Sequence, residues 1–319
     1  MPNLFIVGAM KAATTTLADL LATHDAIFSP IQKEPNIFSE LDESPRPYYT
    51  LLAPKFGSGE PSPISKSPSV CAEEYRDLYR GSEAYRFRLD ASTNYLPSPC
   101  SAQLIHRVAP DAKIIVLLRN PYERAYSSFA YQLSRGRESA GSFDAAIRHE
   151  LAGGRSDWAY AWRHVQTSCY DDGISRYDAE FNCDQIKSIL FEDFIHDPRS
   201  VVDEIADFLK IPTLPEFPER SSNITSLPKT RASRAVKGIF SYGPFRRKMR
   251  RFLPRPIQRP VKRVIEANLA WIDARGERPP RPARAALERL ALVFEPEITK
   301  LECRLQQDLS EWRLPGIRS

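Results

Sequence analysis

Short runs of apolar residues alternate along the chain with stretches whose apolar residues recur every three or four positions. The clearest run covers 112–121, where every residue from Ile114 to Leu118 is apolar, and similar runs cover 4–7 and 186–194. Uninterrupted apolar runs of this length are typical of strands buried on both faces of a parallel sheet. We therefore expect three such strands, the first of which ends at Gly8.

Helical spacing follows each predicted strand. We expect helices over 14–22, over 122–133, within 143–182, and over 197–211 with an Asp-Pro start. Strands that alternate with helices indicate an α/β fold, a single domain with a central parallel sheet that is doubly wound and flanked by helices. In such sheets ligands bind at the carboxyl ends of the strands, which here lead into two connections, 8–16 and 119–127.

Other segments differ in composition but are assigned to the same domain, 1–319. Residues about 40–86 are rich in Pro, Ser and Gly and predict a loop-rich excursion with short helices. Residues about 212–263 form a basic, Pro-rich segment. Residues about 282–312 predict a C-terminal helical region, interrupted near Pro296 because proline removes a helix hydrogen bond.

The composition is that of an ordinary globular protein. Of the 319 residues, 42% are hydrophobic and 27% are charged, and no apolar run approaches the roughly 20 residues that span a bilayer. The five cysteines are scattered and lack CxxC spacing, which argues against a disulfide framework or a zinc site. We expect reduced thiols, no metal, no transmembrane segment and a cytoplasmic location.

The net charge of +5 is concentrated in one part of the chain. Twelve Lys and Arg residues, and no Asp or Glu, lie in 231–263, which leaves the rest of the chain at a net −7. Such a segment either attracts an anion, such as a nucleotide, an acidic glycan or a membrane surface, or is a solvated stretch without a ligand.

The connection after the first predicted strand has the chemistry of an anion site. A helix N-terminus presents free N–H groups and partial positive charge. Here small residues allow close approach, hydroxyls add donors and one lysine adds a full charge: Ala9, Lys11, Ala12, Ala13, Thr14, Thr15 and Thr16. The lysine comes too early for a Walker A loop and nothing is placed to hold Mg²⁺, so an ATP-dependent kinase is a weaker alternative. An ordinary capped turn is the other alternative.

A second connection carries a similar set of side chains. Arg119 ends a predicted strand, and Arg124, Ser127 and Ser128 follow on the next helix. Because Ser127 comes eight residues after Arg119, both side chains are expected to face one anion. Two anion-binding turns on neighbouring strands suggest a ligand with phosphates at both ends, such as a nucleotide with 5′ and 3′ groups.

At this point the chain resembles the sulfotransferases that use 3′-phosphoadenosine 5′-phosphosulfate (PAPS), especially the heparan-sulfate-type branch and its bacterial relatives. The matching stretches keep the family's order over nearly the whole chain: 5–24, 32–38, 90–96, 114–129, 189–194, 208–211 and 308–312. The resemblance implies a P-loop-like sulfotransferase fold. It also implies in-line transfer of a sulfuryl group from PAPS to a hydroxyl or amine, on a glycan or a small metabolite.

The resemblance assigns donor-binding roles by position. Residues Lys11–Thr16 match the loop that holds the 5′-phosphosulfate, where Lys11 would neutralise charge on the leaving oxygen. Arg119 and Ser127 match the pair that grips the 3′-phosphate. Lys229 and Arg231 lie where the family closes over the nucleotide.

The resemblance also implies roles for residues beside the acceptor. Glu34 matches the general base of the heparan-type branch. The chain departs from the family at Ala13, where glycine is usual, and at Ala91, where some relatives carry a lysine beside the acceptor. The β-carbon of Ala13 is tolerable where the backbone is in an ordinary region. Lys33 and Lys66 are candidates to replace the missing lysine.

Two further pairs have more than one interpretation. Asp90 and Asn94 either line the acceptor pocket or form the turn that contains them. Trp158 and Trp162 are four residues apart and are expected to share a helix face, as core packing or as an aromatic platform for a sugar.

Several function classes remain open on the sequence alone. The acceptor is a glycan, a lipid head group or a small metabolite, whereas nucleic acid is not an expected partner. The alternative from another class is a non-catalytic nucleotide or polyanion binder that uses 231–263. The oligomeric state is not predicted.

Overall fold

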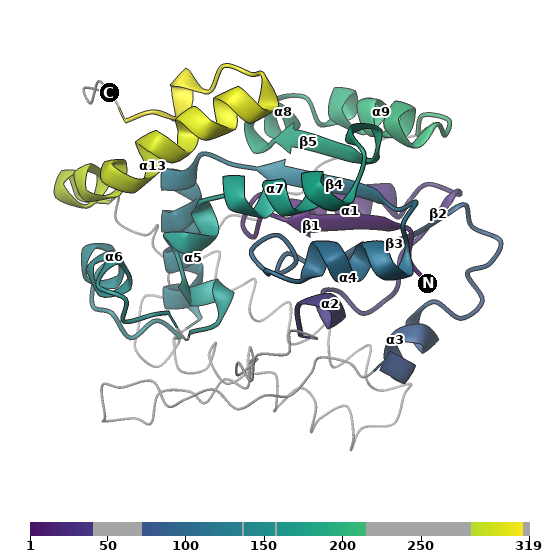
Figure 1. Ribbon diagram of the computed structural model, residues 1–319, viewed down its shortest axis with the longest axis horizontal. Helices are drawn as coiled ribbons and strands as arrows, with labels where there is room; N and C mark the ends of the chain where they lie inside the picture. Colours follow the sequence, from purple (N-terminus) through teal and green to yellow (C-terminus); the bar gives the residue numbers. More distant parts are fainter. Residues whose placement is uncertain (41–71, 136, 157, 215–281, 315–319) are drawn as a thin grey trace.

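A parallel sheet forms the centre of the computed structural model (Figure 1), which describes residues 1–40, 72–135, 137–156, 158–214 and 282–314. The five strands are β1 (Leu4–Gly8), β2 (Ile27–Phe28), β3 (Phe87–Ala91), β4 (Lys113–Leu118) and β5 (Ile186–Leu190). They pair in the order β2-β3-β1-β4-β5, and every pairing is parallel. In β1, Leu4 lies opposite Leu89 on one side and Lys113 on the other.

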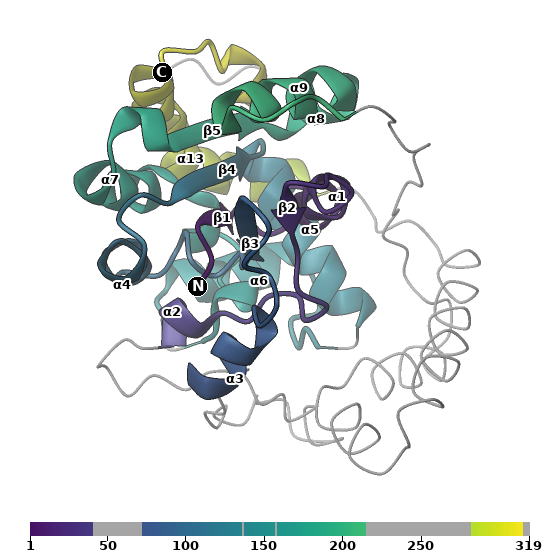
Figure 2. The same cartoon turned by 90° about the vertical axis from the view of Figure 1, so that its right-hand side faces the viewer.

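Helices cover both faces of the sheet. Figure 2 shows α4 and α7 on one face and α1 and α9 on the other. The α-helices are α1 (Thr14–Leu21), α2 (Ile37–Glu40), α3 (Ala72–Leu78), α4 (Ser101–Val108), α5 (Pro121–Ser134), α6 (Phe143–Leu151), α7 (Asp171–Glu180), α8 (Phe191–His196), α9 (Pro198–Leu209) and α13 (Arg284–Leu305). The predicted α/β class, with a central parallel sheet flanked by helices, is therefore confirmed.

The expected strands and helices form for the reasons that the sequence suggested. All side chains of Ile114–Leu118 are fully buried, as a strand covered on both faces requires. Helix α5 begins after Asn120, whose Oδ1 accepts a hydrogen bond from the N–H of Tyr122 at 3.0 Å, and has a proline in its first turn. Asp197 caps α9 in the same way.

Two expectations about secondary structure were wrong. Strand β3 was missed because it is only five residues long and lies between a polar excursion and the turn that begins near Ala91. The segment 143–182 contains helices, as expected, but not one continuous helix: α6 and α7 are separated by two short 3₁₀ helices, η1 (Tyr160–Trp162) and η2 (Gln166–Ser168). Strand β5 ends at Leu190, and the following residues form α8 instead.

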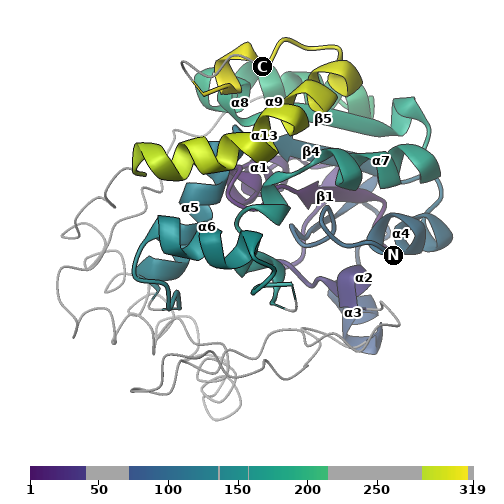
Figure 3. The ribbon, with the colours of Figure 1, turned by 60° about the vertical axis from the view of Figure 1, so that its left-hand side comes forward.

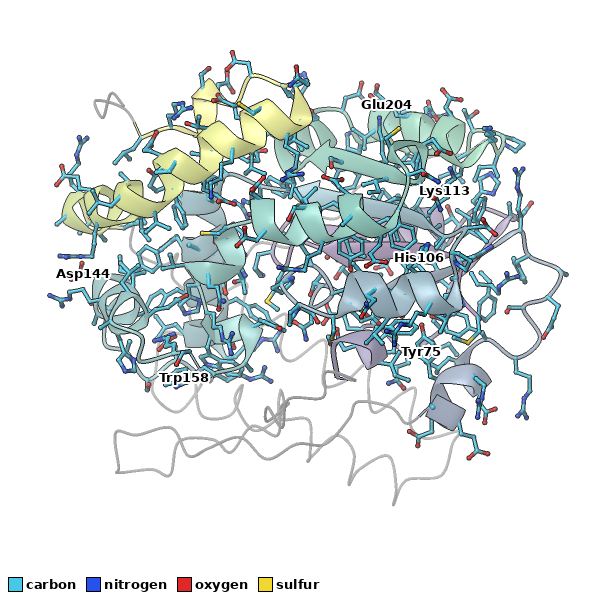
Figure 4. All side chains as sticks on the ribbon, viewed as in Figure 1. Tyr75, His106, Lys113, Asp144, Trp158 and Glu204 are labelled. Carbon is cyan, nitrogen blue, oxygen red and sulfur yellow. The ribbon has the colours of Figure 1, made fainter. Side chains whose placement is uncertain are left out.

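The two tryptophans therefore do not share a helix face. Trp162 is buried in η1 with Ala159 and Ala161, and Trp158 packs at the edge of this small cluster, beside the His149 ring (Figure 4). This arrangement matches the core-packing interpretation rather than a platform for a sugar. The physical reason is that the chain turns sharply between the two residues, so helical spacing does not apply.

The C-terminal helix is not interrupted at Pro296. Helix α13 continues through this proline, and Figure 3 shows it lying across α5, α6 and α7. Leu290, Phe294 and Ile298 are buried along its inner side, so packing against three helices compensates for the lost backbone hydrogen bond. No helix in the described ranges is long and apolar enough to cross a membrane.

Parts of the predicted segments lie outside the described residues. This applies to 41–71 in the loop-rich excursion and to 215–281, which contains the basic segment except for its first residues, 212–214. The described remainder of the excursion contains one of the expected short helices, α3.

A buried polar network joins α5 to the segment before α7. Glu138 accepts hydrogen bonds from both terminal nitrogens of Arg155, at 2.8 and 3.0 Å, and lies 2.9 Å from His164 Nε2. His164 Nδ1 is 3.0 Å from the Ser128 hydroxyl, which donates to the Ala161 carbonyl. The order Ser-His-Glu is that of a hydrolytic triad. However, these side chains are essentially inaccessible, so the network is structural.

This network predicts loss of stability in acid. Burial would raise the pKa of Glu138, but hydrogen bonds from His164 and Arg155 hold it at about 2. Burial lowers the pKa of His164 to about 4. Both values lie below those of an unfolded chain, so the unfolded state binds more protons and stability falls as pH decreases from about 6.5 toward 2. Urea unfolding at a series of pH values measures this fall.

The matched variant is His164→Gln, which keeps polar atoms but does not titrate. It is expected to reduce the pH dependence between about 6.5 and 4. An unchanged dependence in this variant would contradict the assignment to His164.

Candidate active site

The connection between β1 and α1 is open to an anion. Ala13 occupies the position before α1, no side chain caps the helix, and its first turn contains no acidic residue. The N–H groups of this turn therefore have no side-chain acceptor, and Thr15 is exposed beside them while Thr14 is buried. An uncapped helix N-terminus with hydroxyls around it suits a phosphate or sulfate group.

The β-carbon of Ala13 would be tolerable in an ordinary backbone region, but Ala13 is not in such a region. Its φ is 61° and its ψ is 20°, which is the left-handed region, and Lys11 also has a positive φ of 72°. An L-residue with a β-carbon is strained in this region, whereas glycine is not. The loop therefore keeps the conformation that a glycine would favour, at a cost in stability.

Ala13→Gly is accordingly expected to stabilise the protein by about 1 kcal/mol, because it removes this strain. Ala12→Gly is the matched control, since Ala12 is not among the residues with positive φ and its methyl group is buried. The control is expected to lose stability. Denaturant unfolding of both variants provides the measurement, and a destabilised Ala13→Gly protein would contradict the prediction.

Arg119 joins the connection after β4 to the connection between β1 and α1. It follows β4, which pairs directly with β1, and its Nη1 donates to the Lys11 carbonyl at 3.2 Å. The guanidinium also pairs with Glu123 at 2.8 Å and lies 4.3 Å from the centre of the Phe191 ring. The two connections that the sequence singled out therefore form one continuous site.

Helix α5 contributes a face of polar and basic residues to this site. Fully buried Arg124 donates from Nε to the Met10 carbonyl at 3.0 Å and from Nη1 to the His164 carbonyl at 3.1 Å. Ser127 is half-buried on the same helix, whereas Ser128 faces the interior network. Arg124 thus connects α5 to the loop between β1 and α1. This contact positions α5, the helix that carries Ser127, beside the loop.

Lys11 lies among other positive charges. Its Nζ is 4.2 Å from the centre of the Tyr131 ring. Burial lowers the pKa of Lys11 to about 8, and the charges of Arg119, Arg135 and Arg124 act in the same direction. An anionic ligand would relieve the repulsion among these cations, which contributes to the lowered pKa of Lys11.

Glu34 is an acidic residue whose charge acts on Lys11. It has a φ of 49°, and its Oε1 accepts a hydrogen bond from the Thr93 hydroxyl at 3.1 Å. Although the residue has exposed surface, atoms crowd its carboxylate, and this desolvation raises the pKa of Glu34. The Thr93 hydrogen bond opposes the rise, Asp90 adds to it, and Lys33 and Lys11 oppose it. Glu34 and Lys11 thus influence each other directly.

The candidates for a second lysine have different outcomes. Lys33 points to α1, where its Nζ pairs with Asp19 at 2.6 Å. Lys66 lies outside the described residues, as do the nucleotide-closing candidates Lys229 and Arg231. Ala91 ends β3 and offers no charge. Lys33 therefore stays the candidate among the described residues, since its charge acts on Glu34 although its ammonium is paired with Asp19.

Asp90 and Asn94 lie differently from each other. Asp90 is fully buried and hydrogen-bonded, so it belongs to the turn and the core rather than to a pocket wall. Asn94 lines a small pocket beside the loop, together with Ala9, Met10, Thr93, Arg124 and Tyr160 among others. The described part of the chain contains no group of three His, Cys, Asp or Glu residues arranged to hold a metal.

Sequence reasoning missed Tyr131, Thr93 and Phe191, which contact Lys11, Glu34 and Arg119 respectively. A signal for Tyr131 was present, because it follows Arg124 by seven residues and Ser127 by four, the spacing of residues on one side of a helix. Thr93 and Phe191 carry no such signal, because tertiary contacts alone bring them to the site.

Comparisons with known proteins agree with this geometry. A family model described as "Sulfotransferase family" matches residues 2–216. Heparan sulfate glucosamine 3-O-sulfotransferase 6 of Homo sapiens is 28% identical over 209 residues, covering 65% of this chain and 52% of the relative. A bifunctional heparan sulfate N-deacetylase/N-sulfotransferase of Drosophila melanogaster is 26% identical over 225 residues, covering 68% of this chain and 20% of the relative.

A solved structure extends the match. The sulfotransferase from Alicyclobacillus acidocaldarius has a TM-score of 0.68 and 26% identity, covering 98% of this chain and 99% of that one. By contrast, the chain spans about half the length of the first curated relatives it matches. Because the family model covers most of the chain and includes both strand-end connections, this chain belongs to the sulfotransferase family.

Proposed function

We propose that this sulfotransferase moves a sulfuryl group from PAPS to a hydroxyl or amine of a glycan or a small metabolite. The observation that carries the proposal is the contact between the two strand-end connections, through Arg119 and the Lys11 carbonyl. A ligand with an anionic group at each end fits such a paired site. The proposal extends to a single domain over 1–319 and to a cytoplasmic location, where the free thiols of the described cysteines would persist.

The donor would be held by charge and by backbone donors. The N-terminus of α1, Ala12, Ala13, the hydroxyls of Thr14–Thr16 and the Lys11 ammonium would bind the 5′-phosphosulfate. Arg119 and Ser127 would bind the 3′-phosphate, with Lys229 and Arg231 closing over the nucleotide. These groups supply positive charge themselves, so the proposal assigns no role to a metal.

Catalysis would consist mainly of positioning and charge stabilisation, as in phosphoryl transfer. The acceptor oxygen or nitrogen forms a bond to sulfur, while the bond from sulfur to the bridging phosphate oxygen breaks. Glu34 takes the acceptor proton, and adenosine 3′,5′-bisphosphate (PAP) leaves with the electron pair. Lys11 is placed to stabilise the charge that develops on this leaving group.

A carbohydrate acceptor is favoured by the names of the relatives. One is a heparan sulfate glucosamine 3-O-sulfotransferase, and another, of Mus musculus, is named carbohydrate sulfotransferase 15. On this basis, the acceptor group that we propose for this chain is a hydroxyl or amine of a glycan. Lipid head groups and other small metabolites are the alternatives, and incubation with labelled PAPS and host extract identifies the labelled product among them.

A melting experiment tests donor binding without knowledge of the acceptor. PAP at 100 times its Kd is expected to stabilise the protein by about 2.7 kcal/mol. Adenosine 5′-monophosphate, which lacks the 3′-phosphate, is the matched control and should stabilise it much less. Equal effects of the two nucleotides, or none from PAP, would contradict the proposal.

Two other functions predict different results. A non-catalytic polyanion binder would show salt-sensitive binding that survives Lys11→Ala and Glu34→Ala. A kinase would require Mg²⁺-dependent turnover of ATP. Label transfer from PAPS without ATP distinguishes both from the proposed activity.

A further inference from the structure

Asp90 is a fully buried carboxylate to which the mechanism above gives no role. It is the penultimate residue of β3, and both of its oxygens accept hydrogen bonds from hydroxyl groups. Oδ2 accepts from Tyr75 at 2.7 Å and from Tyr95 at 2.9 Å, and Oδ1 accepts from Ser92 at 2.6 Å. Burying a carboxylate is costly, and an ordinary turn does not require one.

A chain of hydrogen bonds leads from Asp90 to the turn that carries Glu34. The Ser92 hydroxyl donates to Asp90 and accepts from the backbone N–H of Asn36 at 3.1 Å. The Asn36 side chain in turn donates to the Glu34 carbonyl at 3.0 Å. The next residue after Ser92 is Thr93, whose hydroxyl binds the Glu34 carboxylate.

The turn needs such support because of its backbone. Glu34 and Asn36 both have positive φ, 49° and 56°. Residues with side chains adopt this region at a cost, so surrounding contacts must hold them there. The Ser92 hydroxyl supplies this contact to Asn36. Because Ser92 donates its proton to Asp90, its oxygen is left to accept the hydrogen bond from the Asn36 N–H.

Aromatic packing fixes the other end of the chain. Tyr75, on α3, is buried below the sheet (Figure 4), and the Phe38 ring lies between it and Tyr95 at 5.6 and 5.7 Å. The hydroxyls that hold Asp90 therefore come from rings with little freedom to move. The hydroxyl of neighbouring Tyr79 donates instead to the Leu89 carbonyl.

We propose that Asp90 is a positioning residue that acts through Ser92 and Asn36 to hold the Glu34 carboxylate where it accepts the acceptor proton. This inference rests on the proposed role of Glu34 as the base. It adds a fully buried carboxylate, to which no contact with substrate is assigned, to the residues that set the reaction rate.

The charge of Asp90 also acts on Glu34. The charged groups that face Glu34 are Asp90, which raises its pKa, and Lys33 and Lys11, which lower it. Burial raises the pKa of Asp90 itself, while the hydrogen bonds from Ser92, Tyr75 and Tyr95 oppose this rise and favour the ionised form. Removing the Asp90 charge should therefore lower the pKa of Glu34.

The first test does not require an acceptor. The carboxyl ¹³C resonance of Glu34, assigned by its loss in Glu34→Gln, is titrated in the wild type and in Asp90→Asn. The titration is expected to move to lower pH in the variant. An unchanged titration would overturn the electrostatic part of the inference.

The second test separates positioning from binding. Ser92→Ala breaks the chain but leaves the Asp90 charge, and it is expected to lower kcat by roughly 10²-fold, with KM for PAPS and stabilisation by PAP unchanged. Tyr75→Phe removes one hydroxyl from Asp90 and should lower kcat less. Tyr79→Phe, one residue beyond the end of α3, is the matched control, because the Tyr79 hydroxyl donates to the Leu89 carbonyl, and it should leave kcat unchanged.

The outcomes are distinct. If Glu34→Gln abolishes transfer but Ser92→Ala does not reduce kcat, the positioning inference is overturned while the proposed function stands. If no acceptor takes label from PAPS, the proposed function fails, and the ¹³C titration still decides whether Asp90 is coupled to Glu34. Should Asp90→Asn fail to fold, the titration in Tyr75→Phe, compared with Tyr79→Phe, decides the coupling.

Discussion

Lys11→Met is expected to lower kcat by about 10²- to 10³-fold, the loss typical when one group that stabilises transition-state charge is removed. The Lys11 ammonium lies among Arg119, Arg124 and Arg135 at the open end of β1. Methionine keeps much of the length and packing against Tyr131 but removes the charge. The measurement is label transfer from PAPS under saturating donor.

Lys187→Met is the matched control for this variant. Lys187 lies on β5 and pairs with Glu204 at 2.9 Å, and it is not among the charged groups that act on Lys11 or Glu34, so its loss should change kcat little. Equal losses in the two variants would contradict the assigned role of Lys11.

The pKa of Lys11 adds a pH signature. A value of about 8 in the free protein means that the ammonium loses its proton as pH rises through this range. Because only the charged form attracts the donor, kcat/KM for PAPS should fall above about pH 8. The bound donor favours the charged form, so kcat should persist to higher pH than kcat/KM.

Glu34→Gln is expected to lower kcat by about 10²- to 10⁴-fold, the usual contribution of a general base. The glutamine side chain still accepts a hydrogen bond from Thr93, so the turn should keep its geometry while the proton acceptor is lost. Melting with PAP should be unchanged, because the residue does not hold the donor. A parallel loss of PAP binding would contradict the assignment.

The pH profile provides the direct evidence for this base. Glu34 must be ionised to take a proton, and desolvation raises its pKa above the ordinary glutamate value. Activity should therefore rise with pH through this raised pKa and be lost on acidification. This acidic limb should be absent from the residual activity of Glu34→Gln, whereas Glu83→Gln, an exposed control, should retain it.

The sequence and the structure agree best where one local property dominates. Strand β4 was predictable because a short, uninterrupted run of apolar residues is typical of a strand that is buried on both faces of a sheet. Helices α5 and α9 were predictable because an Asn or Asp cap followed by proline defines a helix start. The position of Lys11–Thr16 at a connection from a strand to a helix was also predictable, because an apolar run is followed there by helical spacing.

Agreement was lost where packing overrides local preference. Pro296 lies inside α13 because contacts with three helices outweigh the proline, and no local pattern reports those contacts. Strand β3 forms because its backbone pairs with β1, although the residues on either side of it in the sequence are typical of turns. Ala13 adopts a left-handed conformation because the loop demands it, not because alanine favours it.

The sequence by itself determined the fold class and the family, and it predicted the kind of ligand, because apolar periodicity and the residue types at strand ends are local properties. Only the tertiary structure decided which side chains act together. The Arg119–Lys11 contact, the Thr93–Glu34 hydrogen bond and the route from Asp90 to Asn36 each join segments dozens of residues apart. Such distances are set by strand order and burial, which depend on the whole chain at once.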